Sequence, residues 1–557
     1  MEVMSKLTGG FLIAQTLSNC GVKCIFTISS GSLIGLYDAC DELGINIIHT
    51  RHEAAAAFMA DAWSRVTRQL GVCAVTLGPG ATNTITGLMS ADLAASPMLV
   101  IAAQASTNKL DMGYCQSYNV MPLMNSVSKY SRTILSVERI PEYFLSAYRQ
   151  SMSGRPGPVF LEVPFDIMYG KVEKDKTKVP KKKNIKNNFR SRPDSDLISE
   201  ASFLLNKSEK PIIIAGSGVW WSGAHKELKK LVENSQIPFF LARMARGAIP
   251  ESHPLFFGVG YIGNNYVLEY ALKNCDVILM IGHRWDYDLN YGLPPLVSSK
   301  IKTIQIDIEA EEIGRNRPVE VGIVSDALCA IKDLQGKISR KKDSNWLLDL
   351  SKIKKKIKNQ QNVFFKSDDI PMHPLRFLKG VKDGIPKDTI VVTGHGEIDF
   401  WADPFLTVSS PGHYLRAGQS GTMGAEIPYG VAAKIANPEK NVLVVVGDGA
   451  FGYHGFELDT AERYNAPIVI VIGNDNAWGA IRQQQIERGH KLIATELKDR
   501  RYEKLAEMLG GYGEYVTDPN DISKVLKKAF KSNKPVVVNV KIRSCQSPYM
   551  KWFGKGH

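Results

Sequence analysis

The chain has 557 residues, more than one hydrophobic core normally organises, so roughly two to four domains are expected. Hydrophobic residues make up 44% of the sequence and charged residues 22%, which is ordinary for a globular protein and excludes a largely disordered chain. The formal net charge of +13 means that a nucleic-acid partner has to be considered first.

Two lysine-rich segments, 171–188 and 337–346, carry much of the positive charge. No aromatic residue interleaves with the first segment and Pro180 interrupts it, so we interpret both as solvated linkers rather than as a surface for RNA or DNA. They cut the chain near 171–190 and 337–362. The three blocks that remain are expected to be domains at 1–175, 190–340 and 360–557.

The sequence shows no sign of export or of a membrane segment. It begins without a long apolar stretch, and no uninterrupted apolar run reaches about 18 residues. Only Cys20 and Cys24 are close together among the cysteines, with no second pair at zinc spacing. We therefore expect a soluble, cytoplasmic protein with no disulfide framework, no zinc site, and no nucleic-acid or membrane partner.

Short apolar runs alternate with helical stretches in all three blocks, and a glycine-bearing turn follows each run. The pattern is clearest at 24–32, 71–83, 210–223 and 441–452. Alternation of this kind predicts parallel sheets, and hence an α/β protein of three doubly wound domains. Ligands of such sheets bind beyond the carboxyl ends of the strands, where glycine turns admit a phosphate.

Three features in chain order have both a functional and a structural interpretation. Glu53 begins an alanine-rich helical stretch, where a single Glu need only favour the helix dipole. Gly216 and Gly218 form a turn for which a nucleotide contact and a purely structural role remain open. Met423 lies between glycines, although burial in a core is the usual fate of a methionine.

The most informative stretch is 447–476, where Gly447-Asp448-Gly449 follows one apolar run and Asn474-Asp475 ends the next. Parallel strands end at the same edge of a sheet, so Asp448 and Asp475 can converge on one ion beside a diphosphate. Hard oxygen ligands of this kind suit Mg²⁺. The alternative is that Asp448 caps a helix and Asp475 lies in a turn.

This spacing resembles the signature of thiamine-diphosphate enzymes, in which Gly-Asp-Gly is followed at a similar distance by Asn-Asn. Here Asp475 stands where the second Asn is usual, which keeps a hard oxygen and adds a negative charge. The resemblance implies that Asp448, Asp475 and the carbonyl of Ala477 are the metal ligands. It also implies cofactor contacts from Gly447, Asp448, Gly449, Ala450, Asn474, Ala477 and Trp478.

Two earlier features fit the same family. Glu53 matches the acid that hydrogen-bonds the aminopyrimidine ring and so promotes loss of the thiazolium proton. Met423 matches the apolar residue that wedges between the two rings and bends the cofactor. Within stretch 393–403, the same resemblance implies that four residues lie near the diphosphate: Gly394, His395, Gly396 and Glu397.

The resemblance covers nearly the whole chain, and stretches 75–104, 154–166 and 244–258 look like the acetolactate synthase and pyruvate oxidase group. It implies pyrimidine-binding, middle and diphosphate-binding domains in that order. Stretch 281–316 is similar to 2-hydroxyacyl-CoA lyases and oxalyl-CoA decarboxylases, in which an Arg helps to hold an ADP moiety. Arg284 and Asp307 are then nucleotide candidates, unless Arg284 only pairs with Asp286 or Asp288.

Two residues are expected to face the substrate. Ser32, like Ser29, lies in the loop where benzaldehyde lyase carries histidines, so a hydroxyl can orient a carbonyl there but no imidazole can transfer a proton. Gln116 matches a position that faces the substrate carbonyl, with a surface glutamine as the alternative. Stretch 474–485 also looks closer to benzaldehyde lyase and acetolactate-synthase-like proteins.

We therefore expect a carbon–carbon lyase or carboligase that uses thiamine diphosphate and Mg²⁺ on a small-molecule substrate. The leading expectation is a 2-hydroxyacyl-CoA lyase, which reversibly releases an aldehyde or ketone and formyl-CoA, with ADP or CoA bound to the middle domain. The alternatives are an acetolactate-synthase-type carboligase, to which FAD would belong, and a noncatalytic homologue. The resemblance also implies a homodimer or homotetramer with sites shared between subunits.

Overall fold

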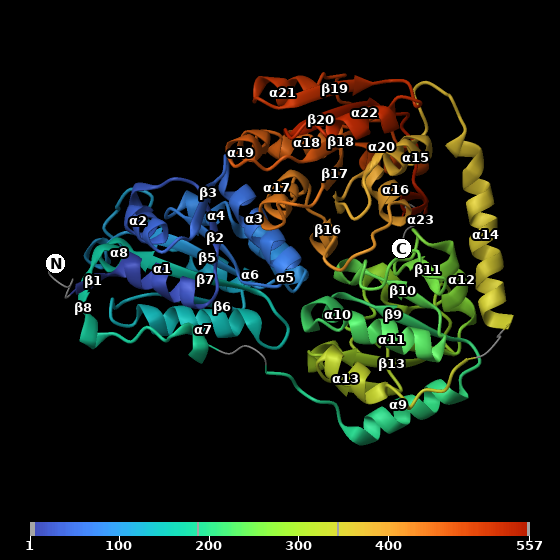
Figure 1. Ribbon diagram of the computed structural model, residues 1–557, viewed down its shortest axis with the longest axis horizontal. Helices are drawn as coiled ribbons and strands as arrows, with labels where there is room; N and C mark the ends of the chain where they lie inside the picture. The colour runs from blue at the N-terminus through green and yellow to red at the C-terminus, as the bar shows by residue number, and fades with distance from the viewer. Residues whose placement is uncertain (1–5, 186–188, 342–344, 554–557) are drawn as a thin grey trace. The chain divides into compact units, whose positions relative to one another are not determined.

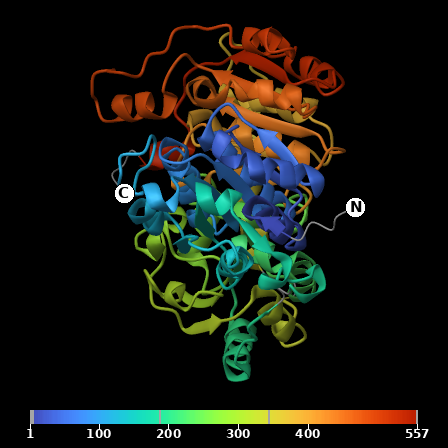
Figure 2. The ribbon, with the colours of Figure 1, turned by 90° about the vertical axis from the view of Figure 1, so that its left-hand side faces the viewer.

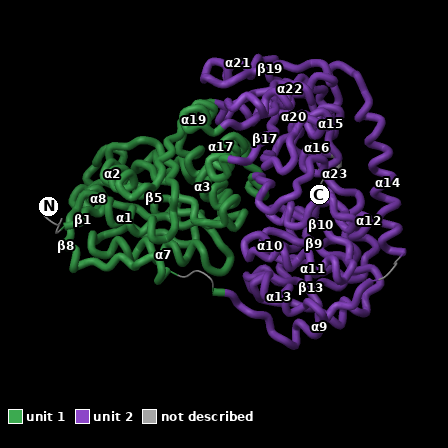
Figure 3. The backbone as a smooth tube through the Cα atoms, in the orientation of Figure 1, with its two compact units in different colours: residues 1–189, 417–438, 456–466 green, residues 190–416, 439–455, 467–557 purple. Residues whose placement is uncertain are grey.

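The computed structural model describes residues 6–185, 189–341 and 345–553 (Figure 1). The backbone forms two compact units (Figure 3). The first unit comprises residues 1–189, 417–438 and 456–466, and the second comprises 190–416, 439–455 and 467–557. Three six-stranded parallel sheets flanked by helices confirm the predicted α/β class. The domain boundaries stay a prediction, since two segments of the third block pack within the first unit.

The six-stranded sheet of the first unit has the strand order β3-β2-β4-β5-β7-β6, and every neighbouring pair is parallel. A small antiparallel sheet of β1 (Lys6–Thr8) and β8 (Lys171–Glu173) lies in the same unit. Its strands are β2 (Cys24–Thr27), β3 (Asn46–His49), β4 (Gly71–Val75), β5 (Met98–Gln104), β6 (Tyr130–Thr133) and β7 (Pro158–Pro164). Its helices include α1 (Gly9–Asn19), α2 (Ile34–Glu42), α3 (Glu53–Thr67), α5 (Ile85–Leu93), α7 (Ile140–Met152), α17 (Glu426–Ala436) and α19 (Glu457–Arg463). Figure 2 shows the chain from the side on which the blue helices of this unit face the reader.

Helix α3 is covered on every side. Its N-terminus is capped by the His52 side chain, and it ends where Arg68 adopts the left-handed conformation with φ 58°. Residues 55–65 are all buried, which explains why the stretch is rich in alanine rather than amphipathic. The packing is close: a Cβ at Gly71 would lie 1.9 Å from the Ala60 carbonyl oxygen.

The second unit contains two sheets, each with all its pairs parallel. The middle sheet has the order β11-β10-β9-β12-β13-β14, and the C-terminal sheet has the order β16-β15-β17-β18-β20-β19. The middle strands are β9 (Pro211–Ala215), β10 (Phe239–Leu241), β11 (Phe256–Val259), β12 (Val277–Ile281), β13 (Lys302–Asp307) and β14 (Val321–Val324). The C-terminal strands are β15 (Ile390–Thr393), β16 (Tyr414–Arg416), β17 (Val442–Gly447), β18 (Val469–Asn474), β19 (Tyr512–Val516) and β20 (Val536–Lys541).

Helices surround both sheets of this unit (Figure 1). Those of the middle part are α9 (Ser195–Lys207), α10 (Ser217–Ser222), α11 (His225–Ser235), α12 (Tyr266–Asn274) and α13 (Ala327–Leu334). Those of the C-terminal part are α15 (Pro374–Gly384), α16 (Glu397–Phe405), α18 (Asp448–His454), α20 (Gly479–Glu487), α21 (Glu503–Met508), α22 (Ile522–Ala529) and α23 (Pro548–Phe553).

The second lysine-rich region is not a linker throughout, and here the prediction was wrong. Residues 345–365 form α14 (Asn345–Phe365), whose Trp346 and Leu350 are buried in a hydrophobic cluster. The Trp346 indole N–H donates to the Pro211 carbonyl oxygen at 3.2 Å. The lysines lie on the exposed side of the helix, so composition alone suggested a solvated linker. Residues 186–188 and 342–344 of the two regions lie outside the described residues.

Candidate functional site

The predicted metal ligands follow two neighbouring strands of the C-terminal sheet. Strands β17 and β18 pair in parallel, and Asp448 and Asp475 directly follow their last residues, Gly447 and Asn474. Asp448 is 2% exposed, and its Oδ2 atom has no hydrogen-bond partner among the described residues. The two carboxylates thus share one edge of the sheet, as the sequence pattern predicts for parallel strands.

The electrostatics of this edge favour a bound cation. Burial, and then the charge of Asp475, raise the pKa of Asp448 to about 7. Burial also raises the pKa of Asp475. The buried Asp448 carboxylate and the half-buried Asp475 carboxylate repel one another, and a divalent ion would offset both the repulsion and the unpartnered oxygen. The residues present therefore fit Mg²⁺.

The remaining ligands would come from outside these side chains. Among the described residues, no group of three or more His, Cys, Asp or Glu side chains has an arrangement that could hold a metal ion. Mg²⁺ is commonly held by one or two carboxylates together with phosphate oxygens and waters, which is compatible with this pair. Ala477, whose carbonyl was predicted as a ligand, is buried in the turn after Asp475.

Several predicted cofactor residues shape this edge. Asn474 is fully buried, donates from Nδ2 to Asn539 Oδ1 at 3.1 Å, and accepts from the Asn476 backbone N–H at 3.1 Å. Its side chain therefore fixes the turn. Gly449 has to be small, since a Cβ there would lie 2.6 Å from the Trp478 ring. Ala450 is buried in α18, and Gly447 is the last residue of β17.

Glu397 adds a third carboxyl group near this edge. It is the first residue of α16, and its Oε1 accepts a hydrogen bond from the Ser547 backbone N–H. Burial raises its pKa to about 8, with a further contribution from the charge of Asp475. At neutral pH Glu397 therefore keeps its proton and can donate a hydrogen bond to a phosphate oxygen instead of repelling it.

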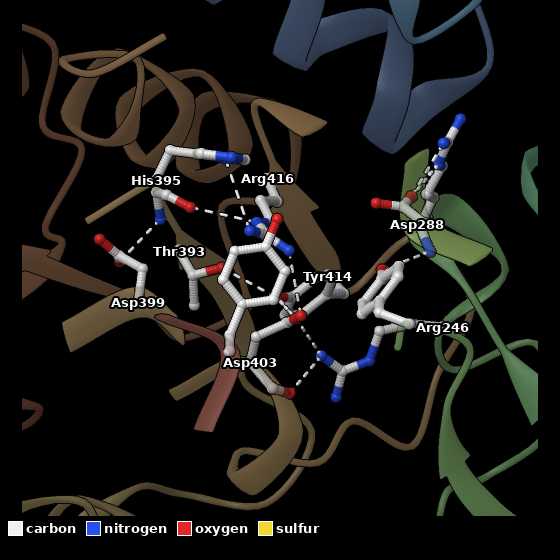
Figure 4. A network of polar contacts seen from close by, with 12 residues as sticks. Arg246, Asp288, Thr393, His395, Asp399, Asp403, Tyr414 and Arg416 are labelled. Atoms are coloured by element: carbon white, nitrogen blue, oxygen red, sulfur yellow. Dashed lines mark hydrogen bonds and ion pairs between the residues drawn. The ribbon is translucent and has the colours of Figure 1, made fainter. Parts of the chain in front are cut away.

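The loop that carries Gly394 and Gly396 is fixed from two sides (Figure 4). Asp399 accepts hydrogen bonds from the Gly394 and Gly396 backbone N–H groups at 2.8 and 2.9 Å. Arg416 donates from Nε to the Gly394 carbonyl oxygen at 3.1 Å. Burial and the Arg416 charge lower the pKa of His395 to about 3, so its ring is neutral. Neither Asp399 nor Arg416 was predicted from the sequence.

The loop also joins a buried charge network. Asp403 pairs with Arg416 at 3.1 Å and with Arg246 at 2.9 Å, and it accepts a hydrogen bond from the Tyr414 hydroxyl (Figure 4). Thr393, at the end of β15, lies 2.8 Å from the same Tyr414 hydroxyl. The end of β15 leads into the loop of residues 394–396, called the cofactor loop below. Charges from distant parts of the sequence therefore hold this strand end.

The predicted activating residues lie in the first unit. Glu53 is the first residue of α3, and its Oε2 accepts a hydrogen bond from Asn83 Nδ2 at 3.0 Å. Met423 is half-buried just before α17, and α17 packs on α3. The Tyr429 hydroxyl of α17 donates to Asp61 of α3, which fixes the two helices to one another. Asn83 was missed, although it belongs to the GPGATN motif that the sequence displays.

The predicted substrate residues Ser32 and Gln116 each contact the segment that follows β4. Ser32 Oγ lies 2.7 Å from Ser30 Oγ and 3.3 Å from Thr76 Oγ1, which forms a short chain of hydroxyl groups. Gln116 is exposed with φ 62°, and its carbonyl oxygen lies so close to Gly78 that a Cβ there would be 2.2 Å away. Glycine is required at position 78 for this approach.

The nucleotide candidates lie at the end of adjacent middle strands. Ile281 and Ile306 are partners in the register of β12 and β13, which brings Arg284 and Asp307 to one edge. Arg284 also donates to Asp286 at 3.1 Å and to Glu312 at 2.8 Å, so the pairing that the sequence left open with Asp286 is present. Burial raises the pKa of Asp307 to about 6.

Gly216 and Gly218 serve the packing of this middle part. A Cβ at Gly218 would lie 2.6 Å from the Gly282 Cα, and one at Gly216 would lie 2.5 Å from the Gly282 carbonyl oxygen. The two glycine turns therefore pack directly against each other. This contact supports the structural interpretation of the motif.

Comparison with known proteins agrees with this geometry. Models of the thiamine pyrophosphate enzyme N-terminal TPP binding domain, central domain and C-terminal TPP binding domain match residues 7–123, 198–334 and 394–540. The chain belongs to the thiamine pyrophosphate enzyme family. Within the described ranges of this family member, no helix is both long and apolar enough to cross a bilayer.

Relatives of this thiamine pyrophosphate enzyme carry two kinds of name. It is 32% identical to the acetolactate synthase large subunit IlvG of Mycobacterium tuberculosis over 95% of both chains. It is 33% identical to a probable acetolactate synthase large subunit of Methanocaldococcus jannaschii, over 96% of this chain and 92% of the relative. It is 31% identical to 2-hydroxyacyl-CoA lyase 2 of Bos taurus, over 97% of this chain and 91% of the relative. The relatives are lyases or acyloin-forming enzymes, and they do not distinguish between the two activities.

Proposed function

We propose that this enzyme cleaves and forms carbon–carbon bonds with thiamine diphosphate and Mg²⁺. The observation that carries the proposal is that buried Asp448 and half-buried Asp475 end neighbouring strands, with Asp448 Oδ2 unpartnered among the described residues. When bound, thiamine diphosphate would supply the carbon nucleophile for a substrate carbonyl. The protein then has to orient the substrate, transfer a proton and exclude water.

The roles of individual residues follow from their chemistry. Glu53 is proposed to exchange a proton with the aminopyrimidine ring, and its hydrogen bond from Asn83 orients the carboxyl group. Met423 is proposed to bend the cofactor. The hydroxyl of Ser32 and the amide of Gln116 are proposed to orient substrate oxygens, because neither group titrates near neutral pH.

We propose a 2-hydroxyacyl-CoA as the substrate class. The supporting observation is that Arg284 and Asp307 share one edge of the middle sheet, where a guanidinium could bind a diphosphate and a carboxylate could bind a ribose hydroxyl. The second candidate is carboligation of 2-keto acids. It is favoured by the existing contacts of Arg284 to Asp286 and Glu312, which an incoming nucleotide would have to displace.

One experiment separates these candidates. The purified enzyme, loaded with thiamine diphosphate and Mg²⁺, is incubated in parallel with a 2-hydroxyacyl-CoA and with pyruvate, and formyl-CoA and acetolactate are measured by mass spectrometry. We expect the enzyme to produce formyl-CoA, and we expect Glu53→Gln to abolish this production. The control is Glu42→Gln, a change at an exposed residue, which should leave the production intact. Acetolactate without formyl-CoA would move the assignment to the second candidate. Full cofactor binding without turnover on either substrate would indicate a noncatalytic homologue.

We also propose that the active enzyme is a homodimer, alone or paired into a tetramer. The support is the family resemblance, which implies that the pyrimidine-binding domain of one subunit completes the diphosphate-binding domain of another. Mixing inactive Glu53→Gln with inactive Asp448→Ala under subunit exchange should then restore activity, because a mixed dimer has one site free of both changes. Demonstrated exchange without recovered activity would refute the shared site.

A further inference from the structure

The loop that carries Gln116 has a defined anchor in the first unit. Residues 111–116 are exposed, and they follow the end of β5 (Met98–Gln104). Gln104, the last residue of that strand, is only 5% exposed. Its amide is in contact with the loop on one side and with the neighbouring strand β7 on the other.

All four hydrogen-bonding positions of the Gln104 amide are used. Its Nε2 donates to the Tyr118 carbonyl oxygen at 3.1 Å and to Glu162 Oε1 at 2.9 Å. Its Oε1 accepts from the Ser117 hydroxyl at 3.0 Å and from the Ala105 backbone N–H at 2.8 Å. Two donors and two acceptor sites are the full capacity of a glutamine side chain.

The orientation of this amide is determined by its neighbours. The Ala105 backbone N–H can only donate, so the oxygen of the amide must face it. The nitrogen then faces Glu162, whose other oxygen already accepts from the Thr133 hydroxyl at 2.8 Å. In this orientation Gln104 donates to the loop at Tyr118 and accepts from it at Ser117, the two residues that directly follow Gln116.

We propose that Gln104 is a positioning residue that sets the substrate-facing conformation of Gln116. The inference rests on the proposed role of Gln116. Gln104 itself is buried behind the loop and is not a catalytic residue. Without the anchor, the loop keeps the left-handed conformation of Gln116 and its close approach to Gly78 only through weaker contacts. Substrate binding should therefore suffer, whereas cofactor binding should not.

An exchange of side chains tests this role against a merely structural one. Gln104→Glu places two carboxyl groups together and removes the donor to Tyr118. The double variant Gln104→Glu, Glu162→Gln restores one donor and one acceptor between the strands, since the amide introduced on β7 can donate to the carboxylate introduced on β5. It cannot restore the donor to the Tyr118 carbonyl. Core stability should recover in the double variant, but the loop anchor should not.

Two measurements follow the loop. The first is the rate at which a maleimide labels Cys115, an exposed thiol beside Gln116, with the partly exposed Cys329 of the second unit as internal reference. The second is the KM and kcat of the cofactor-loaded enzyme. In the double variant we expect wild-type melting and wild-type thiamine diphosphate affinity. We also expect Cys115 labelling several-fold faster relative to Cys329, and a KM raised on the order of tenfold at similar kcat.

The outcomes are distinct. Wild-type KM and wild-type Cys115 labelling in the double variant would overturn the proposal and leave Gln104 a structural residue. Faster Cys115 labelling with unchanged KM would show that the anchor exists but does not position substrate, which also overturns it. If the wild-type enzyme turns over no substrate, the proposed function fails, and so does the inference that depends on it. The labelling result then still reports separately whether the anchor holds the loop.

Discussion

Replacing Arg246 by methionine should destabilise the second unit strongly. The Arg246 side chain is fully buried and donates to both oxygens of Glu251, at 2.8 and 2.9 Å, to Asp403 Oδ1 at 2.9 Å, and to two backbone carbonyls (Figure 4). After the change, Asp403 keeps Arg416 and the Tyr414 hydroxyl. Glu251 keeps a hydrogen bond from the Val408 backbone N–H at 3.2 Å. Breaking a buried ion pair of this kind costs about 3–5 kcal/mol.

The size of the loss can be measured in two ways. The second unit has more than 300 residues, so its unfolding entropy is about 0.7 kcal/mol/K and a loss of about 3–5 kcal/mol corresponds to a fall in Tm of about 4–7 °C. Because a chain of several domains need not unfold in one step, hydrogen exchange of segments 246–256 and 400–408 is measured as well. Arg139→Met is the control, since the Arg139 and Glu142 side chains are 55% and 60% exposed and solvent screens their ion pair.

A second variant shows which partner is responsible. If the orphaned Glu251 charge dominates the cost, Arg246→Met combined with Glu251→Gln should recover about half of the loss, because the amide is cheaper to bury than the carboxylate. The reasoning is refuted if Arg246→Met melts within about 1 °C of the wild type, the shift expected for less than about 1 kcal/mol. It is also refuted if the double variant is no more stable than the single one.

The remaining predictions concern the cofactor and the pH dependence. Asp448→Ala should weaken Mg²⁺-dependent binding of thiamine diphosphate at least about 100-fold by calorimetry, because one of two carboxylate ligands is lost; unchanged affinity would reject the metal site. Arg416→Lys cannot contact Asp403 and the Gly394 carbonyl together, so the cofactor Kd should rise about tenfold with little change in Tm. Burial raises the pKa of Glu457 from 4.5 to about 6, so the folded state binds this proton more tightly and stability is lost as pH rises from 4.5 through 6. Glu457→Gln should therefore gain about 2 kcal/mol at pH 8 and under about 0.5 kcal/mol at pH 4.5, and equal gains at both pH values would contradict the assignment.

The sequence predicted those features that depend on neighbouring residues along the chain. Alternating apolar runs and glycine turns predicted the three parallel sheets, and the position of Asp448 and Asp475 after two strands predicted that they share an edge. Helix α14 was missed because its lysine-rich composition outweighed its apolar spacing: Trp346, Leu350, Ile353 and Ile357 recur at helical intervals and pack on one hydrophobic cluster. Gln104 was missed because nothing in its local sequence indicates four hydrogen bonds to distant groups.

The charge network around Arg246 was not predictable for a related reason. Arg246 and Asp403 are 157 positions apart, and each is ordinary in its own segment. A pattern of neighbours predicts where a strand ends, but not which distant charge will neutralise a buried carboxylate there. The same residues, once buried, have to be paired, because an isolated charge would cost several kcal/mol. The fold, and the sheet edge at which the metal-binding residues lie, could thus be predicted from the sequence. The residues that fix the cofactor loop could not.

Asp475 stands where the family pattern has an amide, and it shows how a change in a sequence motif depends on charges elsewhere in the fold. A carboxylate at this position adds a negative charge beside Asp448, and the structure offsets it in two ways. Burial and this charge together raise the pKa of Glu397 to about 8, so that carboxyl group stays neutral and does not add a third charge. Arg482 stabilises the Asp475 carboxylate, and Lys541 stabilises the Asp448 carboxylate. A divalent ion would therefore meet two carboxylates in surroundings that already compensate part of their charge, so the departure from the family pattern is compatible with a working metal site.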